Sequence, residues 1–162
     1  MIDRLPAPLC LAPLLAALLA APGPAAAQAN GGIIALPFSS AIPPAQRVCA
    51  AKTVSGLGYT ELRRGTGATP ARTDTVTINY IGYLAATGAV FDQAMATPMP
   101  LDRVIDGFSE GLQLASKGAV LRLCLPAALG YGAKAVGPIP ANSDLVFQIE
   151  LIEIAEPAAD AQ

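Results

Sequence analysis

Thr-Gly-Ala-Val-Phe-Asp-Gln, residues 87–93, places a single carboxylate directly after an aromatic side chain, just past the end of a predicted strand. The Thr-Gly pair is a turn signal, and Val90 and Phe91 form an apolar pair ahead of Asp92. On one interpretation, Asp92 is an ordinary turn residue whose side chain caps nearby backbone groups. On the other, Phe91 and Asp92 form one wall of an apolar pocket with a single polar group.

The segments around this stretch show the alternation of β-strands that bury one face. Residues 75–84 read TVTINYIGYL, and the apolar positions of this run predict that Tyr80 points inward. Residues 58–64, 119–125 and 145–151 are also predicted strands. The predicted inward side chains of the last two are Leu121, Leu123, Leu125, Leu145, Phe147, Ile149 and Leu151. The side chains predicted to point outward are Arg122, Cys124, Gln148 and Glu150, with Gln148 and Glu150 facing water. This pattern is typical of half-buried antiparallel strands.

One helix is predicted after the stretch at 87–93. Phe108, Leu112 and Ala115 are spaced i, i+4 and i+7, which puts them on one helical face. Gly118 is expected to cap the C-terminus of this helix. One short helix and several strands with one apolar face each predict an α+β fold, with the sheet wrapped over the helix.

Two loops carry apolar side chains between glycines and prolines. Residues 126–132 read PAALGYG and present Tyr131, and residues 137–140 read GPIP and present Ile139. Such side chains on a rigid scaffold indicate binding, although local packing is the simpler explanation for each of them taken singly.

Composition excludes several function classes. The net charge is −2 and no basic cluster is present, which disfavours nucleic-acid binding. The chain has no histidine, so it has no histidine-based nucleophile pair and no histidine metal site. Three cysteines scattered at positions 10, 49 and 124 do not form a thiolate zinc site. We therefore expect chemistry without a metal, a cofactor or a covalent step.

Taken together, five motifs resemble the FKBP-type peptidyl-prolyl cis-trans isomerases over roughly residues 56–154. They are VTINYIGYL, TGAVFDQA, RVIDGFSEGLQL, LRLCLPAALGYG and GPIPANSDLVFQIELIEI, in family order and with family-like spacing. The resemblance implies an antiparallel half-barrel sheet of about five strands curled around one short helix. It also implies a non-covalent isomerase that accelerates rotation about X-Pro bonds in folding proteins.

The resemblance also implies a set of site residues. The catalytic set implied is Tyr80, Asp92, Ile105 and Tyr131. The substrate-binding set implied is Phe91, Met99, Val104, Phe108, Ile139 and Phe147. In this picture the Ile105 backbone N–H receives a substrate carbonyl, and the Tyr131 phenol hydrogen-bonds the ligand. We expect Asp92 to be hydrogen-bonded to Tyr80 and to fix the polar edge of the pocket.

The chain departs from the family pattern in three places. Phe108 stands where the family usually has tryptophan at the floor of the pocket. Met99 or Leu101 replaces a flanking aromatic, in a stretch shorter than in many members. Pro140-Ala141 stands where relatives have Pro-Pro.

The ends of the chain predict export. Residues 9–21 form an apolar run of 13 residues followed by small residues, which fits a signal peptide over residues 1–29 cleaved after Ala27 or Ala29. An uncleaved membrane anchor is the alternative. Residues 30–55 are expected to be a flexible arm, residues 56–155 the folded domain and residues 156–162 a disordered tail. The protein is then periplasmic or secreted.

Export would affect whether the cysteines form a disulfide. Cys10 is expected to leave with the leader, and in an oxidising compartment Cys49 and Cys124 can form a disulfide. Two unpaired thiols are the alternative.

The expected partners are proline-containing unfolded or partly folded polypeptides, together with the macrolide inhibitors of the family. The rival hypothesis is a catalytically weak proline-peptide-binding module or chaperone. No flap domain is inserted between residues 82 and 104, and residues 30–55 are too rich in proline and glycine for a helical dimerisation region. We expect a monomer that binds no membrane once the leader is removed.

Overall fold

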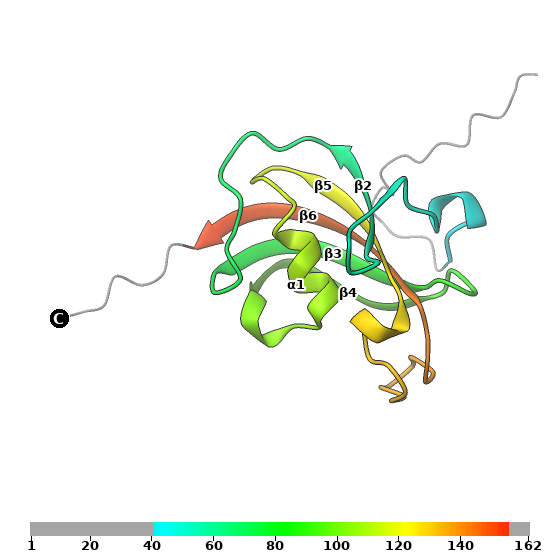
Figure 1. Ribbon diagram of the computed structural model, residues 1–162. Coiled ribbons are helices and arrows are strands. Elements are labelled where there is room, and N and C mark those ends of the chain that lie inside the picture. Colours follow the sequence, from blue (N-terminus) through cyan, green and yellow to red (C-terminus); the bar gives the residue numbers. More distant parts are fainter. Residues whose placement is uncertain (1–40, 156–162) are drawn as a thin grey trace, which may run out of the picture.

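The computed structural model describes residues 41–155 of the chain, so the expected signal peptide and C-terminal tail fall outside the described residues. The described elements are η1 (Pro44–Gln46), β1 (Ala51–Lys52), β2 (Gly58–Arg63), β3 (Thr75–Leu84), β4 (Val90–Pro100), η2 (Leu101–Arg103), α1 (Asp106–Leu112), β5 (Val120–Leu125), η3 (Ala127–Leu129) and β6 (Leu145–Ala155). They form an open, antiparallel, six-stranded sheet in the order β1-β2-β5-β6-β3-β4 (Figure 1). The predicted α+β fold is confirmed, with six strands where about five were expected.

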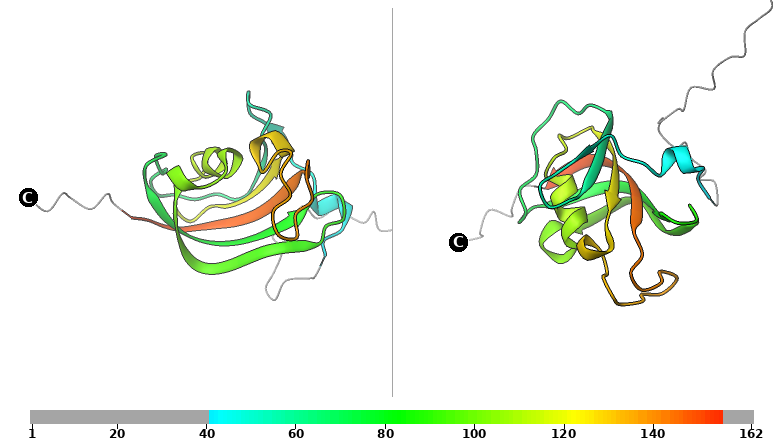
Figure 2. Two further views of the ribbon diagram at one scale, coloured as in Figure 1. Left: turned by 90° about the horizontal axis from the view of Figure 1, so that it is seen from below. Right: turned by 45° about the vertical axis from the view of Figure 1, so that its right-hand side comes forward.

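The sheet curls around α1, which lies against its concave face (Figure 2). The inward side chains of β3, β5 and β6 pack with Phe108 and Leu112 of the helix in the main core. The helix lies very close to β5, because a Cβ at Gly111 would stand 2.3 Å from Cδ1 of Leu123. Glycine at this position therefore sets how deeply the helix enters the curved sheet.

The helix ends earlier than its apolar spacing predicted. Its last residue is Leu112, and Gln113 is the C-cap. Ala115 lies beyond the helix and is nevertheless buried. Gly118, expected as the cap, instead takes a φ of +88° in the turn that leads into β5. The prediction of a Gly118 cap was wrong because residues 113–118 already turn back toward the sheet.

Strand β4 was not predicted, and its irregularity explains why. It is an edge strand whose pairing with β3 shifts register twice, and it contains two prolines and Ala96 at a φ of +46°. Bulges and prolines are tolerated at sheet edges, and they break the alternation by which a strand is recognised in sequence. Phe91 and Asp92 therefore lie within a strand, rather than past the end of one.

The outer face of the sheet has a second buried cluster, made of Ile42, Ile81, Tyr83 and Val146. Arg122 and Gln148, predicted to point outward, do lie on this face, yet they are only 1% and 7% exposed. The expectation that Gln148 faces water was wrong, because this face is itself partly covered: Ile42 packs there with Ile81, Tyr83 and Val146. Alternation identified the two faces but could not show that both are covered.

Residues 41–55 were expected to belong to a flexible arm, but in the structure they are attached to the rest of the domain. Ala51 and Lys52 form the edge strand β1, and Ser55 Oγ donates to the Glu110 carboxylate of α1. The Ile42 N–H donates to the Gly88 carbonyl at 2.9 Å. Arg47 Nη1 donates to the carbonyls of Ala85 at 2.9 Å and Ala86 at 2.7 Å. These bonds and the buried Ile42 side chain fix the segment, while residues 30–40 lie outside the described range.

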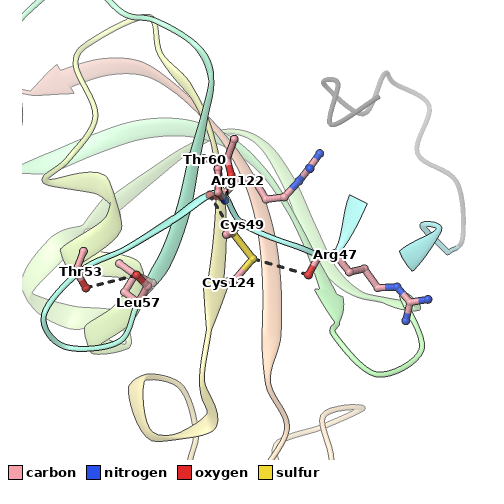
Figure 3. The surroundings of a disulfide bond; sticks show 8 residues. Arg47, Cys49, Thr53, Leu57, Thr60, Arg122 and Cys124 are labelled. Atoms are coloured by element: carbon pink, nitrogen blue, oxygen red, sulfur yellow. Dashed lines mark hydrogen bonds between the residues drawn. A yellow bond between two sulfur atoms is a disulfide. The ribbon is translucent and has the colours of Figure 1, made fainter. Parts of the chain in front are cut away.

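A disulfide between Cys49 and Cys124 joins the same segment to β5, with the two Cα atoms 6.1 Å apart (Figure 3). Gly58 lies against the bridge, and a Cβ there would stand 2.9 Å from the Cβ of Cys124. The structure thus has the bridged form of this cysteine pair, and the absence of a side chain at position 58 leaves room for it.

Candidate functional site

A cavity of about 260 Å³ opens on the concave side of the sheet, between β3, β4, the η2–α1 junction and the loop after η3. Its lining combines aromatic, aliphatic and a few polar side chains, which is typical of a pocket for a small apolar group. The lining residues are Tyr80, Asp92, Met99, Arg103, Val104, Ile105, Phe108, Tyr131 and Phe147.

Three of the aromatic rings in the lining pack edge to face or tilted against one another. The Phe108 ring is 5.1 Å from that of Phe147 and 6.0 Å from that of Tyr80, both in T-shaped contacts. Such contacts are favourable and directional, so they hold the rings in fixed orientations. Phe108 is only 3% exposed, which places it at the bottom of the pocket.

Phe91 supports this aromatic wall from behind and does not line the cavity. Its ring contacts that of Phe147 at 5.5 Å in another T-shaped pair. Both rings pass over Gly82, where a Cβ would stand 2.5 Å from Cζ of Phe91 and 2.9 Å from Cε1 of Phe147. Glycine at position 82 therefore allows the Phe91–Phe147 contact.

The predicted hydrogen bond between Tyr80 and Asp92 is present. The Tyr80 hydroxyl donates to Oδ2 of Asp92 at 2.7 Å, and the Gln93 N–H donates to Oδ1 at 2.9 Å. Sheet register brings the pair together, because Asp92 pairs with Gly82, two residues beyond Tyr80 on the neighbouring strand. Burial, and then the hydrogen bond to Asp92, raise the pKa of Tyr80 well above its usual value. The phenol therefore stays protonated at neutral pH.

Two further donors at the pocket make no hydrogen bond to any of residues 41–155. One is the backbone N–H of Ile105, the N-cap of α1, whose carbonyl accepts bonds from the N–H groups of Phe108 and Ser109. The other is the Tyr131 hydroxyl, on a loop held by a 2.7 Å bond from the Asn142 N–H to the Gly132 carbonyl. Both donors are thus available to a ligand.

The structure gathers most of the predicted site residues around one cavity, but not all of them. Phe91 lies behind Phe147, as described above. Ile139 is 4% exposed and belongs to the core, while its N–H donates to the Val136 carbonyl in a tight turn. Neither side chain is among the residues that line the cavity, so the predicted contact of Ile139 with a substrate stays a prediction. Loop sequence alone could not show whether this isoleucine points into the core or into the pocket.

Arg103 lines the cavity and was missed. It is the last residue of η2 and directly precedes Val104 and Ile105. A cation immediately before the segment whose amide is expected to bind substrate was the signal that could have identified it.

Other kinds of site are not found in the part of the chain that the structure describes. Residues 41–155 contain no cluster of three or more histidine, cysteine, aspartate or glutamate side chains arranged to hold a metal ion. No helix in the same range is both long and apolar enough to cross a membrane.

The sequence model of the family described as "FKBP-type peptidyl-prolyl cis-trans isomerase" matches residues 67–152. This chain belongs to that family. The match includes every residue that lines the cavity. It confirms the resemblance drawn from the five motifs.

Curated relatives and solved structures agree with this assignment. An FkpA-type isomerase of Aeromonas hydrophila is 44% identical over 112 residues, covering 67% of this chain and 41% of that protein. FkpA of Escherichia coli K12 is 40% identical over 119 residues, covering 67% of this chain and 44% of that protein. The crystal structure of E. coli FkpA superposes with a TM-score of 0.63 at 38% identity, covering 67% of this chain and 52% of that one. A peptidyl-prolyl isomerase from Pseudomonas syringae gives a TM-score of 0.62 at 37% identity, covering 65% and 80%. The chain thus spans less than half the length of these two curated relatives.

Proposed function

We propose that the domain catalyses cis–trans isomerisation of X-Pro peptide bonds in proteins. The observation that carries this proposal is the pocket itself: an aromatic cavity of about 260 Å³ with a fixed Tyr80–Asp92 pair at its edge and two unpaired donors at its mouth. The volume and apolar lining suit a proline ring, and the donors suit the carbonyls of the peptide that carries it.

The reaction needs no nucleophile, because no bond to a leaving group is broken. Rotation about the imide bond costs about 18–20 kcal/mol because amide resonance is lost. The twisted imide is less polar than the planar one. A pocket lined by Phe108, Phe147 and Tyr80 excludes water and so favours the twisted form over the planar form.

The two unpaired hydrogen-bond donors at the pocket help to position the substrate. The Ile105 N–H and the Tyr131 hydroxyl are placed to hold flanking substrate carbonyls in the bent geometry of the transition state. Each tenfold acceleration requires about 1.4 kcal/mol of such preference, so a few contacts suffice for a large effect. Asp92 takes no proton in this mechanism. It accepts the Tyr80 hydrogen bond and fixes the polar edge of the pocket.

A proline-limited assay tests the proposal. The exchange rate between cis and trans forms of an Ala-Leu-Pro-Phe peptide, measured by exchange NMR without a coupling protease, should rise with the concentration of the protein. Phe147→Ala should lose most of this acceleration, and Tyr59→Phe, a partly buried tyrosine outside the cavity lining, serves as the matched control.

The assay also separates catalysis from simple binding. If the peptide's resonances shift on titration while its exchange rate stays at the uncatalysed value, the protein is a proline-peptide-binding module or chaperone, and the proposal of an isomerase is wrong. Competition by a macrolide inhibitor of the family would identify the pocket as the site of either behaviour.

We further propose that the protein is exported and acts as a monomer in the periplasm or outside the cell. The apolar run at residues 9–21 and the Cys49–Cys124 disulfide support export, since such bridges persist in oxidising compartments. Intact mass of the protein recovered from a bacterial periplasm should correspond to cleavage after Ala27 or Ala29. An uncleaved mass would contradict the predicted signal peptide, and light scattering would report the oligomeric state.

A further inference from the structure

Arg103 places a positive charge at the rim of the pocket. It ends η2, its side chain is exposed, and it lines the same cavity as the Ile105 and Tyr131 donors. The rest of the lining, apart from Asp92, consists of aliphatic, aromatic and phenol side chains. The pocket therefore has one cation and one anion in its walls.

Within the described range, Arg103 forms no ion pair with a neighbouring side chain. The four ion pairs among residues 41–155 engage Arg63, Arg64, Arg72 and Lys117. Arg72 pairs at 3.2 Å with Asp106, the first residue of the helix beside the pocket. Asp102 adjoins Arg103 in the chain, but within the described range it is not paired with it.

The carboxylate in the lining, that of Asp92, already has hydrogen-bond partners. Asp92 accepts hydrogen bonds from the Tyr80 hydroxyl and from the Gln93 N–H, one on each oxygen. No ion pair joins Asp92 to Arg103 within residues 41–155, so the guanidinium has its donors available at the rim.

We propose that Arg103 is a specificity-determining residue that makes the site prefer X-Pro segments with an acidic residue directly beside the proline. This inference rests on the proposed isomerase function. A guanidinium presents a planar fork of N–H donors that matches a carboxylate in a two-pronged contact. A peptide whose proline ring fills the pocket has its flanking side chains at the rim, where Arg103 lies.

The size of the preference follows from exposure. Ion pairs open to solvent are modest, so an aspartate or glutamate beside proline is expected to raise kcat/KM by about two- to fivefold over a neutral residue of similar size. Because solvent ions screen exposed charges, the preference should shrink as salt is added. A lysine in the same place should lower kcat/KM below that of the neutral peptide.

Exchange NMR on matched peptides tests the proposal. The series is acetyl-Ala-Xaa-Pro-Yaa-Ala-amide, with Glu, Gln or Lys placed first at Xaa and then at Yaa, so that either side of the proline is sampled without other charges. The proteins are the wild type, Arg103→Gln, Arg103→Glu and Lys134→Gln, the last removing an exposed cation that does not line the cavity. Each is measured at low and at high salt.

For wild type and Lys134→Gln we expect a Glu-over-Gln ratio of about two to five on at least one side of the proline at low salt. The Glu-over-Gln ratio should fall to about one in Arg103→Gln and below one in Arg103→Glu, and because both peptides are measured on the same variant, a general change in activity cancels from this ratio. A wild-type ratio near one on both sides, or a ratio that survives Arg103→Gln, would overturn the proposal. Absence of catalysis on every peptide would instead overturn the isomerase function itself.

Discussion

The polar edge of the pocket depends on two side chains, Tyr80 and Asp92. Their 2.7 Å hydrogen bond joins neighbouring strands at a point where the Tyr80 ring also contacts Phe108. A ring that is fixed by a hydrogen bond at its hydroxyl and by a T-shaped contact with another ring has little freedom to rotate. The pair therefore fixes one side of the cavity, and in the proposed reaction, which needs no base, it transfers no proton.

Removing either partner of this bond should lower activity and leave the fold in place. We expect Tyr80→Phe and Asp92→Asn each to lower kcat/KM by about ten- to a hundredfold, because a hydrogen bond to a charged group contributes about 1.5–3 kcal/mol. Peptide exchange rates measured by NMR report the effect, and urea unfolding checks that the variants fold. If both variants kept full activity and unchanged ligand affinity, the role given to the pair would be wrong.

At the scale of elements, one chain of polar contacts ties four strands together. Arg63 of β2 pairs at 2.5 Å with Glu150 of β6, whose other oxygen accepts a 2.8 Å bond from Asn79 of β3. The Asn79 side-chain oxygen in turn accepts the N–H of Ala96 at 2.8 Å, at the left-handed residue of β4. These contacts support the irregular edge strand that carries Asp92. They pass through Asn79, which directly precedes Tyr80 in the chain.

Glu150 is the acidic member of this chain of contacts, and its contribution to stability should depend on pH. The hydrogen bond from Arg63 and then that from Asn79 hold the pKa of Glu150 below its usual value. A depressed pKa stabilises the fold above the unfolded-state value of about 4.3, and this stabilisation is lost as the pH falls through the lower folded-state value.

Glu150→Gln should therefore destabilise the protein at pH 7 by about 1 kcal/mol or less, as for other partly exposed ion pairs. It should also flatten the loss of stability below about pH 4.3. Urea unfolding from pH 7 down to pH 3 measures both effects. Glu61→Gln, which breaks the more exposed Arg64 pair, is the matched control. Parallel pH curves for the wild type and Glu150→Gln would contradict the assignment.

At the scale of the whole molecule, the sheet is covered on both faces. The helix and the loops that carry the site occupy the concave face, and residues 42–49 cover part of the outer face. The disulfide crosses from that segment to β5, closing a sequence separation of 75 residues. A cross-link over so long a loop restricts the unfolded chain strongly.

Loss of the disulfide should reduce stability far more than activity. We expect Cys49→Ala/Cys124→Ala to lower the free energy of unfolding by about 2–4 kcal/mol, measured by urea unfolding. Below its unfolding transition, the double variant should keep its peptide exchange activity within about twofold, because the bridge lies on the face of the sheet opposite to the pocket.

The bridge itself can be checked by mass spectrometry after alkylation. The native protein should take up alkylating reagent at Cys49 and Cys124 only when it has been reduced. Two thiols that react without reductant would show that the cysteines are unpaired, and the stability prediction would then fail with the bridge.

The amino-acid sequence by itself determined the inward faces of β3, β5 and β6, the helix that begins near Phe108, and the family. Each of these depends on local spacing, because alternation and helical periodicity record which side chains share a face. Its motifs also predicted that Tyr80, Asp92, Ile105 and Tyr131 lie near one another. Only the tertiary structure decided what covers each face and which side chains reach the cavity. It buried Gln148 on the outer face of the sheet, placed Ile139 in the core and Phe91 against Phe147, and brought Arg103 to the cavity. These outcomes depend on contacts between residues far apart in the chain, which local periodicity does not record.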